Sequence, residues 1–481
     1  MLTPKFSLTQ DSEFIYIHIH APYIRLSEAE CFVDDDEFRF YANPYYLRLH
    51  FPGKIQEDEK STSKYDVDTG QLTVRVTKQT KSEHFEGLNL LTKLLTPKTN
   101  LVLHASPEIE VLTSDVAAAE VPETEEDEEN WYIEQNLQED DHVNLSLTGP
   151  KYGFANRKSN CLNRVASEIT DLIDLHNPDE ISQKNRRELR EQQEDSLFDC
   201  EHYLADLFDD DIIQELIAAD YKDLTGVVGE HIVLSDKENE KLINLPRRDY
   251  VIEKNNLEAT YLGLVDLMLA YAYTFRFTHG DFGIESDWTI CKLSSTLSWL
   301  DTFQSIDEVV VSFARRCLVF PFYRNWKLFE KVLSDVKSIF NVGKLQILKC
   351  LLGIHSVLLE SEVKHPLNDL YITDYCVWIQ IADAQKIKTM SEALSNIAVS
   401  KSDLNFKLEE MEADAMKLMA ENDDTETEDE KVCSLMKAFD KVVTLKIDET
   451  SDSDDSSDEE EEEENDAKSS DSSDISSQCD S

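Results

Sequence analysis

The residues that could carry out chemistry in this chain do not assemble into the constellation that an enzyme needs. His18 and His20 stand on one face of an expected strand, a spacing that zinc can use, but two ligands are too few. Residues 280–283 (GDFG) contain the DFG of protein kinases, although the other kinase motifs are missing, so a turn between helices is the better interpretation. None of the 12 glycines belongs to a phosphate-binding GxGxxG or GxxxxGK motif. We therefore predict a non-enzymatic protein without cofactor or metal; the alternative is a hydrolase or transferase site built from residues that are distant in sequence.

Three groups of basic residues raise the question of nucleic-acid binding. They are Arg186 with Arg187, Arg315 with Arg316, and residues 324–327 (RNWK), in which an aromatic ring accompanies the charges. The chain has 98 acids and a formal net charge of -51, so ion pairs with carboxylates are the simpler interpretation. A field of that sign repels phosphates and anionic lipid and attracts basic surfaces. The composition therefore predicts no direct contact with nucleic acid or membrane and favours a basic partner.

The acidic residues concentrate in two segments. Residues 421–481 contain 24 acids against 5 lysines, and residues 115–141 contain 12 acids with no lysine or arginine. In the first segment, Ser451, Ser456 and Ser457 each have an acid three residues further on, the spacing that acid-directed kinases favour. Phosphorylation of these serines would add about 1.5 to 2 negative charges each. Segments of this composition hold too little apolar surface to fold alone, so disorder is expected.

Strands are expected in the first 95 residues, because apolar and polar residues alternate there. In residues 14–21, Ile15, Ile17 and Ile19 share one face, and residues 45–51 and 72–76 repeat the pattern. Turn-forming residues separate these runs. Strands with one apolar face need a second layer to cover it, so the sequence predicts an antiparallel β-sandwich over residues 1–95.

The hydrophobic period becomes helical after an acidic flexible linker, which is expected over residues 96–150. An aromatic triplet in that linker, residues 131–133 (WYI), either begins the next domain or docks as a short motif. Between residues 151 and 395, apolar stripes of helical spacing cover residues 204–216, 306–317, 326–340 and 345–355. They predict one all-α domain of about eight to twelve helices, with a buried helix over residues 261–277. Residues 396–481 are expected to add a helical extension and the acidic disordered tail.

The cysteines and the N-terminus suit an intracellular protein. The nine cysteines are odd in number, form no CxxC motif and stand mostly among apolar residues, which is typical of reduced core thiols. No signal peptide is visible at the N-terminus.

The segment order and several motifs resemble the Shq-type assembly factors of H/ACA ribonucleoproteins. In the first domain the resemblance is to the CS domain of that family, over residues 4–10 (PKFSLTQ), 38–41 (FRFY), 44–49 (PYYLRL) and 83–88 (EHFEGL). In the helical domain it is to the family-specific domain, over residues 152–154 (YGF), 245–250 (LPRRDY), 285–290 (ESDWTI), 320–326 (FPFYRNW) and 368–380 (NDLYITDYCVWIQ). The loop at residues 279–285 departs from the family's pattern.

The resemblance implies an assembly chaperone, found in nucleoplasm and cytoplasm, that binds the pseudouridine synthase dyskerin before RNA does. It would cover the RNA-binding surface of the synthase with its helical domain and so support the biogenesis of H/ACA snoRNPs and of the telomerase ribonucleoprotein. A remodelling AAA+ ATPase complex is implied for release, and we expect a monomer. The alternative is a general heat-shock co-chaperone acting through the CS-like domain, although a shared fold does not establish a shared partner.

Eight residues of the family-like stretches are the candidates for partner contact. Large aromatic side chains at helical spacing also pack in cores, so each has an internal role as its alternative. The candidates are Tyr152, Phe154, Asp249, Tyr250, Trp288, Tyr323, Arg324 and Trp326. In the same stretches, Gly153 and Pro246 are expected to form turns.

Overall fold

The structure, a computed structural model, describes residues 1–97 and 149–422 apart from a few short gaps. The gaps are residues 26, 28, 59–60, 163–168, 209–210 and 230–231, and the side chains of residues 418–422 are also left undescribed. Contacts divide the chain into two units, Met1–Glu409 and Glu410–Ser481. Most of the expected linker with its aromatic triplet, and the tail with Ser451, Ser456 and Ser457, lie outside the described residues.

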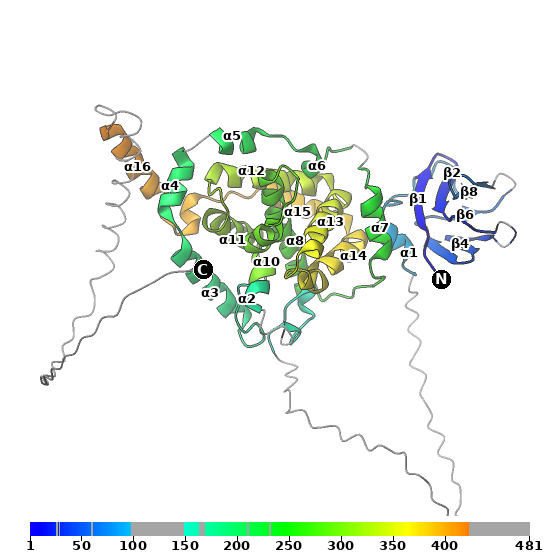
Figure 1. The fold of residues 1–481 in the computed structure, drawn as a ribbon, viewed down its shortest axis with the longest axis horizontal. Helices are drawn as coiled ribbons and strands as arrows, with labels where there is room; N and C mark the ends of the chain where they lie inside the picture. The colour runs from blue at the N-terminus through cyan, green and yellow to red at the C-terminus, as the bar shows by residue number, and fades with distance from the viewer. Residues whose placement is uncertain are drawn as a thin grey trace, which may run out of the picture. The chain divides into compact units, whose positions relative to one another are not determined.

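Two antiparallel sheets form the N-terminal domain and confirm the predicted all-β fold (Figure 1). The strands are β1 (Lys5–Gln10), β2 (Phe14–His20), β3 (Glu30–Asp34), β4 (Glu37–Ala42), β5 (Tyr45–His50), β6 (Ile55–Gln56), β7 (Thr62–Asp66) and β8 (Gln71–Lys78). The larger sheet has the order β1-β2-β8-β6, and β7 also pairs with β8. The smaller sheet has the order β3-β4-β5.

The core of this domain consists of the faces that the alternation predicted. Ile15, Ile17 and Ile19 of β2 are completely buried, and they lie opposite the apolar residues of β8. In the smaller sheet, Phe40 of β4 pairs with Leu47 of β5, and both are buried. The period of two therefore identified β2, β5 and β8 and their inner faces.

A short helix ends the β-domain and contacts the helices that follow. This helix, α1 (Leu91–Leu95), packs against β5 and against α7 (Asp236–Asn244) and α14 (Thr373–Ile381). Thr92 Oγ1 donates a hydrogen bond of 2.6 Å to the carbonyl of Leu242, and the backbone N–H of Lys93 donates one of 3.3 Å to Gln380 Oε1. The end of the β-domain is thus hydrogen-bonded to the helical domain within the first unit.

The remaining described residues are mainly helical, as predicted. Their other elements are η2 (Phe154–Asn156), α2 (Ile169–Leu172), α3 (Gln183–Leu197), α4 (Cys200–Phe208), α5 (Asp211–Ala218), α6 (Lys222–Thr225), α8 (Lys254–Phe277), α9 (Ser286–Leu293), α10 (Ser295–Ser298), α11 (Ile306–Val319), α12 (Trp326–Val342), α13 (Lys344–Glu360), η4 (Asn368–Ile372), α15 (Ala384–Ser395), η5 (Lys401–Leu404) and α16 (Leu408–Asn422).

The helix α8 forms the centre of the helical domain. It has 24 residues, covers the apolar window predicted at residues 261–277, and contacts α9, α11, α12 and α13 (Figure 1). A helix that is apolar around most of its circumference is stable when neighbours surround it, as they do here. Among the described residues, no helix has the length and apolarity that crossing a bilayer would require.

The helical domain contains more helices than the stripes predicted. Helices α2 to α15 fall within residues 151–395, and three of them, α2, α6 and α10, have only four residues, too few to show a hydrophobic period. The stripe predicted over residues 204–216 was wrong as a single helix, because it divides into α4 and α5 and leaves Ile212 58% exposed. The stripes at residues 306–317, 326–340 and 345–355 are confirmed as α11, α12 and α13.

Candidate protein-binding face

Groups with catalytic or metal-binding potential are dispersed or buried in the described part of the chain. No set of three or more His, Cys, Asp or Glu side chains there is placed to hold a metal ion. The described cysteines are free thiols, and Cys291, Cys317, Cys350 and Cys376 are buried. Burial raises the pKa of the Cys291 thiol to about 12, so it stays protonated and is a poor nucleophile.

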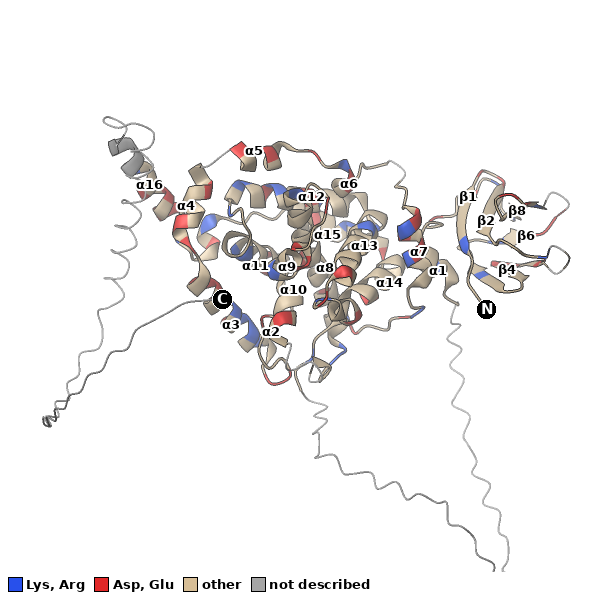
Figure 2. Ribbon diagram, in the orientation of Figure 1, with Lys and Arg blue, Asp and Glu red and all other residues tan. Residues whose placement is uncertain are grey.

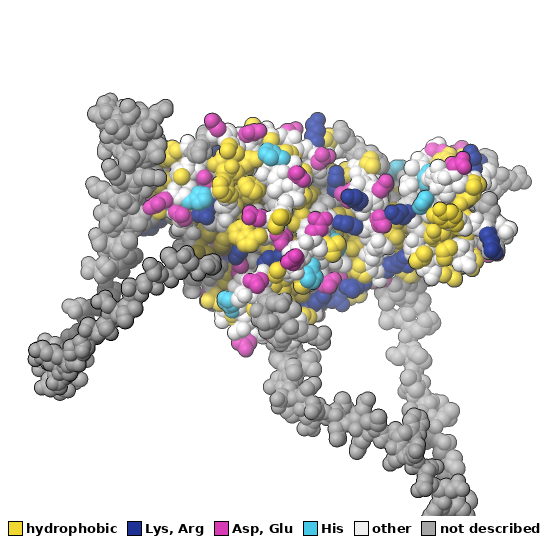
Figure 3. Space-filling view, in the orientation of Figure 1, with side chains coloured by type: hydrophobic (Ala, Val, Ile, Leu, Met, Phe, Trp, Pro, Cys, Tyr) yellow, Lys and Arg dark blue, Asp and Glu magenta, His cyan; other side chains and the backbone are white. Residues whose placement is uncertain are grey.

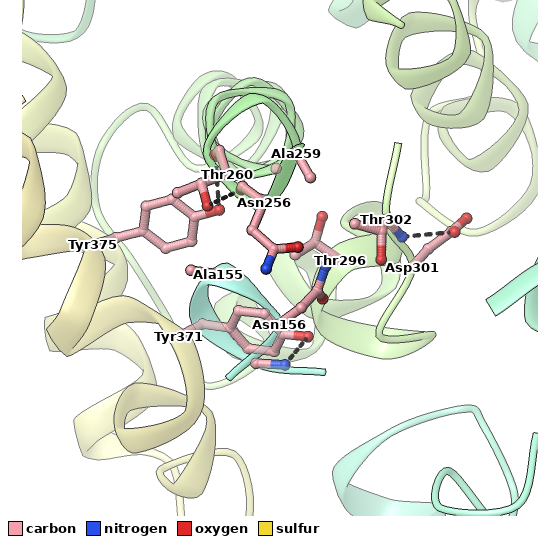
Figure 4. Close-up of a pocket in the computed structure, with 12 residues that line it drawn as sticks. Ala155, Asn156, Asn256, Ala259, Thr260, Thr296, Asp301, Thr302, Tyr371 and Tyr375 are labelled. Atoms are coloured by element: carbon pink, nitrogen blue, oxygen red, sulfur yellow. Dashed lines mark hydrogen bonds between the residues drawn. The ribbon is translucent and has the colours of Figure 1, made fainter. Parts of the chain in front are cut away.

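A small polar cavity lies where η2 meets α8, η4 and α14 (Figure 4). The hydroxyl of Tyr371 accepts a hydrogen bond of 3.1 Å from the N–H of Gly153, and that of Tyr375 donates one of 2.9 Å to the carbonyl of Thr260. The cavity volume is about 20 Å³, room for one water-sized molecule, whereas ligand pockets enclose roughly 300 to 1,000 Å³. These hydroxyls therefore stabilise the fold, and the cavity is too small for a substrate.

Phe154 and Tyr250 belong to an aromatic cluster beside this cavity. The ring of Phe154 packs edge-on against those of Tyr250, Tyr375 and Trp378, with centroid distances of 5.1, 4.9 and 5.9 Å. Tyr250 Oη donates a hydrogen bond of 2.7 Å to Asp374 Oδ1. Burial, and then this hydrogen bond, raise the pKa of Tyr250. The polar tip of Tyr250 is therefore satisfied inside the protein.

Tyr152 is also internal, in the turn that precedes η2. It is completely buried, and its hydroxyl accepts hydrogen bonds from the N–H groups of Cys161 and Leu162 at 2.9 and 3.3 Å. Gly153 has φ of 77°, a conformation that favours glycine, so its predicted role in a turn is confirmed. Asp249 is exposed in the segment between α7 and α8.

The arginines on α11, one of the predicted basic groups, are turned into the domain. Arg315 and Arg316 are 5% and 0% exposed, and both contact the buried Glu194 of α3, at 2.7 and 3.3 Å. Arg190 Nη1 pairs with the same carboxylate at 2.8 Å. Burial favours the protonated form of Glu194, but Arg190, Arg316 and Arg315 together outweigh it and lower its pKa. The predicted ion pairing of Arg315 and Arg316 is confirmed.

The two neighbouring arginines Arg186 and Arg187 of α3 differ from each other. Arg187 pairs with Glu308 at 3.2 Å, as the ion-pair interpretation predicted. That interpretation was wrong for Arg186, which is completely buried and donates hydrogen bonds of 2.6 and 3.1 Å to the carbonyls of Pro178 and Leu300. Its guanidinium donates hydrogen bonds to backbone carbonyls in the segments that connect helices. Hydrophobic spacing in the sequence cannot predict such a contact.

Trp288 of α9 separates two hollows at the surface. Its side chain is 43% exposed and lines both of them. The larger, which we call the Trp288 groove, has a volume of about 860 Å³ and runs between residues 282–292, residues 170–174 and residues 357–364. The smaller, the Arg324 pocket, has a volume of about 270 Å³ and lies between α9, the end of α8, His202 and residues 320–324. Together they form the Trp288 face.

The Arg324 pocket is lined largely by aromatic side chains and contains one hydrogen-bond donor, Arg324 Nη1, that has no partner among the described residues. The backbone N–H of Arg324 bonds to Asp206 Oδ2 at 2.6 Å, and its Nε donates to the carbonyl of Pro321 at 3.2 Å. Its Nη1 is buried without a hydrogen-bond partner among the described residues, and burial lowers the pKa of the guanidinium. A buried donor in this state is available to an acceptor that enters the pocket.

Tyr323 supports the wall of this pocket, whereas Trp326 packs inside the domain. The ring of Tyr323 packs against Phe277 and Phe322, with centroid distances of 5.8 and 4.9 Å. Trp326 is 8% exposed at the start of α12 and donates a hydrogen bond of 2.9 Å to Glu330. Of the eight candidates, the structure therefore brings Trp288 and Arg324 to one surface with Tyr323 beside them, and places Tyr152, Phe154 and Trp326 inside.

Exposed apolar side chains of the Trp288 face were missed from the sequence. Ile284, Phe322 and Val363 line the two hollows and are 99%, 67% and 41% exposed. The space-filling view shows hydrophobic side chains gathered on this domain with charged ones between them (Figure 3). An exposed apolar patch rimmed by charges is typical of a protein-binding site. A signal for Ile284 was present, because it follows Gly283 in a loop that belongs to no helical stripe.

The β-domain and a large part of the helical domain each match the model of a known protein family. Residues 228–408 match the Shq1 domain of the SHQ1 protein, and residues 3–95 match the SHQ1-like CS domain. Both matches agree with the resemblance found in the motifs.

Relatives from distant organisms match most of the chain. "Protein SHQ1 homolog" from Xenopus tropicalis is 41% identical over 433 residues, which cover 88% of this chain and 71% of the relative. The protein of that name from Mus musculus is 38% identical over 88% of this chain and 76% of its own length. "Protein shq1" from Schizosaccharomyces pombe is 33% identical over 90% of this chain and its own full length. The chain therefore belongs to the SHQ1 family of H/ACA ribonucleoprotein assembly factors.

Proposed function

We propose that this protein is an assembly chaperone that binds a dyskerin-type pseudouridine synthase and covers its RNA-binding surface until RNA is loaded. It acts as a monomer in nucleoplasm and cytoplasm, supports biogenesis of H/ACA snoRNPs and of the telomerase ribonucleoprotein, and makes no direct contact with nucleic acid. Release of a tightly held synthase is assigned to a remodelling AAA+ ATPase complex.

The observation that carries this proposal is the burial of three of the clustered arginines in an acidic helical domain. Residues 151–395 contain 40 acids and 27 lysines and arginines, a formal charge of -13. Arg186, Arg315 and Arg316, which could have held phosphates, are buried. Acidic side chains stand on α4 and α5, whereas many basic ones lie on α3, α11 and α12 (Figure 2). The exterior is therefore suited to a basic surface.

A surface built to hold RNA is densely basic, and carboxylates can occupy the places that phosphates later take. Such a chaperone competes with RNA directly, because both need the same lysines and arginines. Complementary charge also accelerates association and makes binding depend on salt. The apolar residues of the Trp288 face would add the contacts that do not depend on salt.

The test is a binding measurement between the full chain and purified synthase. Affinity should fall as salt rises from about 0.1 M to about 1 M, over which the Debye length shrinks from ~10 to ~3 Å. Guide RNA should displace the chain in a competitive manner. A stable ternary complex, with RNA in its groove on the synthase while the chain remains bound, would contradict the proposal.

The second candidate function is that of a general heat-shock co-chaperone acting through the β-domain. The outer face of the smaller sheet favours it. Phe32, Tyr41 and Tyr46 are 56%, 38% and 37% exposed, and Tyr41 and Tyr46 are cross-strand partners. Replacing Phe32 and Tyr41 by alanine should leave synthase binding unchanged if the helical domain carries it. A loss of synthase binding in this variant, with the helical signal intact, would move the contact to the β-domain.

A further inference from the structure

The Trp288 groove has walls from three parts of the helical domain. Residues 282–284 and α9 form one wall, and Thr170, Asp171 and Asp174 contribute a second. The third is the end of α13 with residues 361–364. Its volume of about 860 Å³ is roughly three times that of the Arg324 pocket, so it accommodates a stretch of chain rather than one side chain.

The apolar side chains in this groove are left uncovered by the described structure. Ile284 is 99% exposed and Val363 is 41% exposed, and Trp288 stands between them and the smaller pocket. Side chains this exposed contribute little to the free energy of folding, because they bury little area. Their gathering in one hollow therefore marks a surface that becomes buried when a partner binds.

The charges in the groove leave a surplus of carboxylates. Its two lysines are already engaged: Lys292 pairs with Asp174 at 2.5 Å, and Lys364 Nζ donates hydrogen bonds of 2.5 and 2.9 Å to the carbonyls of Asp171 and Leu172. The groove has five acids in all.

Four of those acids form no ion pair with any residue that the structure describes: Asp287, which accepts a hydrogen bond of 2.5 Å from Ser361 Oγ, and Asp171, Glu360 and Glu362. Glu360 and Glu362 are exposed on the same wall as Val363. An exposed apolar side chain thus lies beside two carboxylates on this rim.

We propose that the Trp288 groove binds an amphipathic basic segment of the synthase, with apolar side chains on Ile284, Trp288 and Val363 and lysines or arginines on Glu360 and Glu362. The identity of the partner rests on the proposed function. The chemistry of the segment rests on the groove, because only a partner that is apolar on one face and basic beside it satisfies both sets of groups. Grooves of this kind take helices through apolar anchors about three to four residues apart.

A synthetic helical peptide tests the groove without the synthase. Its leucines follow an i, i+3, i+4, i+7 pattern and its other positions are lysine; two comparison peptides replace the lysines by glutamate or the leucines by serine. Full-length chain should bind the leucine–lysine peptide at least about tenfold more tightly than either comparison peptide, because both kinds of contact are needed. Equal binding of the serine–lysine peptide would reduce the interaction to general attraction by an acidic chain and overturn the proposal.

Matched charge reversals locate the binding. The groove variant is Glu360→Lys with Glu362→Lys, and the control is Glu258→Lys with Glu392→Lys, four exposed positions that give both variants the same net charge. The groove variant should bind the leucine–lysine peptide and the synthase about tenfold more weakly than the control variant does. An equal effect of both variants on the peptide would overturn the proposal.

The synthase measurement separates the two proposals. If wild-type chain binds the synthase and both charge variants bind it equally, the groove proposal is wrong while the proposed function stands. If wild-type chain does not bind the synthase at all, the proposed function fails, and the peptide still decides whether the groove takes a basic amphipathic segment.

Discussion

The Phe154 cluster and the Trp288 face use similar residues for opposite purposes. Around Phe154, the rings are packed edge-to-face, and the hydroxyl of Tyr250 is bonded to Asp374. Around Trp288, the rings remain at the surface, and Arg324 keeps a donor without a partner among the described residues. The difference lies in what covers them, because η2 packs against α8 and η4 whereas one side of α9 borders open hollows. Similar side chains therefore stabilise the fold at one place and remain available to a partner at the other.

The largest effect on stability should come from Phe154→Ala. The ring is 2% exposed and contacts three other rings, so its removal should lower the free energy of unfolding by about 3 to 5 kcal/mol. Urea unfolding followed by the helical circular dichroism signal measures this loss. Phe154→Leu should cost less, because most of the volume is kept. If Phe154→Ala left stability unchanged but weakened synthase binding, Phe154 would be a contact residue like those of the Trp288 face and not a residue of the core.

The buried carboxylate Glu194 should rank second. Glu194→Gln leaves Arg190, Arg315 and Arg316 without the charge they share, and the free energy of unfolding should fall by about 3 kcal/mol. The matched control is Glu191→Gln on the same helix, since that half-exposed carboxylate pairs with Arg190 at 3.5 Å and with no other residue that the structure describes. Equal losses in the two variants, measured by urea unfolding, would mean that burial of the network adds nothing.

The fold could be predicted from the sequence where the hydrophobic periodicity extended over enough residues to show which face of a strand or helix is buried. The alternation of Ile15, Ile17 and Ile19 identified an inner face, and the stripes of α11, α12 and α13 identified three helices. The four-residue helices escaped because one turn contains no complete hydrophobic period. Ile212 was misassigned because α4 ends at Phe208 and α5 begins at Asp211, so the residues of the predicted stripe belong to two helices and do not share one face.

The candidate site was predicted only in part, because spacing shows which residues share a face and not what covers that face. Trp288 and Arg324 came from family-like stretches, but those stretches also supplied Tyr152 and Phe154, which are buried. Ile284 was missed because loop residues have no periodicity to compare. The arrangement of the groove depends on segments more than a hundred residues apart, which no local pattern reports.

A moderate effect on binding, with a smaller one on stability, is expected for Trp288→Ala. The side chain is 43% exposed, so loss of its buried apolar area should lower the free energy of unfolding by about 1 kcal/mol. A tryptophan at the centre of an interface contributes about 2 kcal/mol, so affinity for the synthase should fall roughly 30-fold in a direct binding measurement. Phe32→Ala, which removes an exposed ring of the β-domain, should leave that affinity unchanged. If Phe32→Ala weakened synthase binding and Trp288→Ala did not, the contact would lie on the β-domain and not on the Trp288 face.

The smallest effect should be that of Glu37→Gln, the surface counterpart of Glu194. Arg39 and Arg48, which are about half exposed, bind the Glu37 carboxylate and lower its pKa to about 2, first through the hydrogen bond from Arg39. Because both arginines are half exposed, solvent screens these pairs, and they contribute roughly 1 kcal/mol although the Glu37 side chain is only 13% exposed. Because the folded pKa lies below the unfolded value, this contribution is present above about pH 4.5 and is lost as pH falls towards 2. The difference in unfolding free energy between wild type and Glu37→Gln should therefore shrink between about pH 6 and pH 3. The comparison variant is Glu13→Gln, which removes an exposed pair with Lys81 at 3.6 Å. If the difference in unfolding free energy between wild type and Glu37→Gln stayed constant with pH, Glu37 would stabilise the fold by some means other than its negative charge.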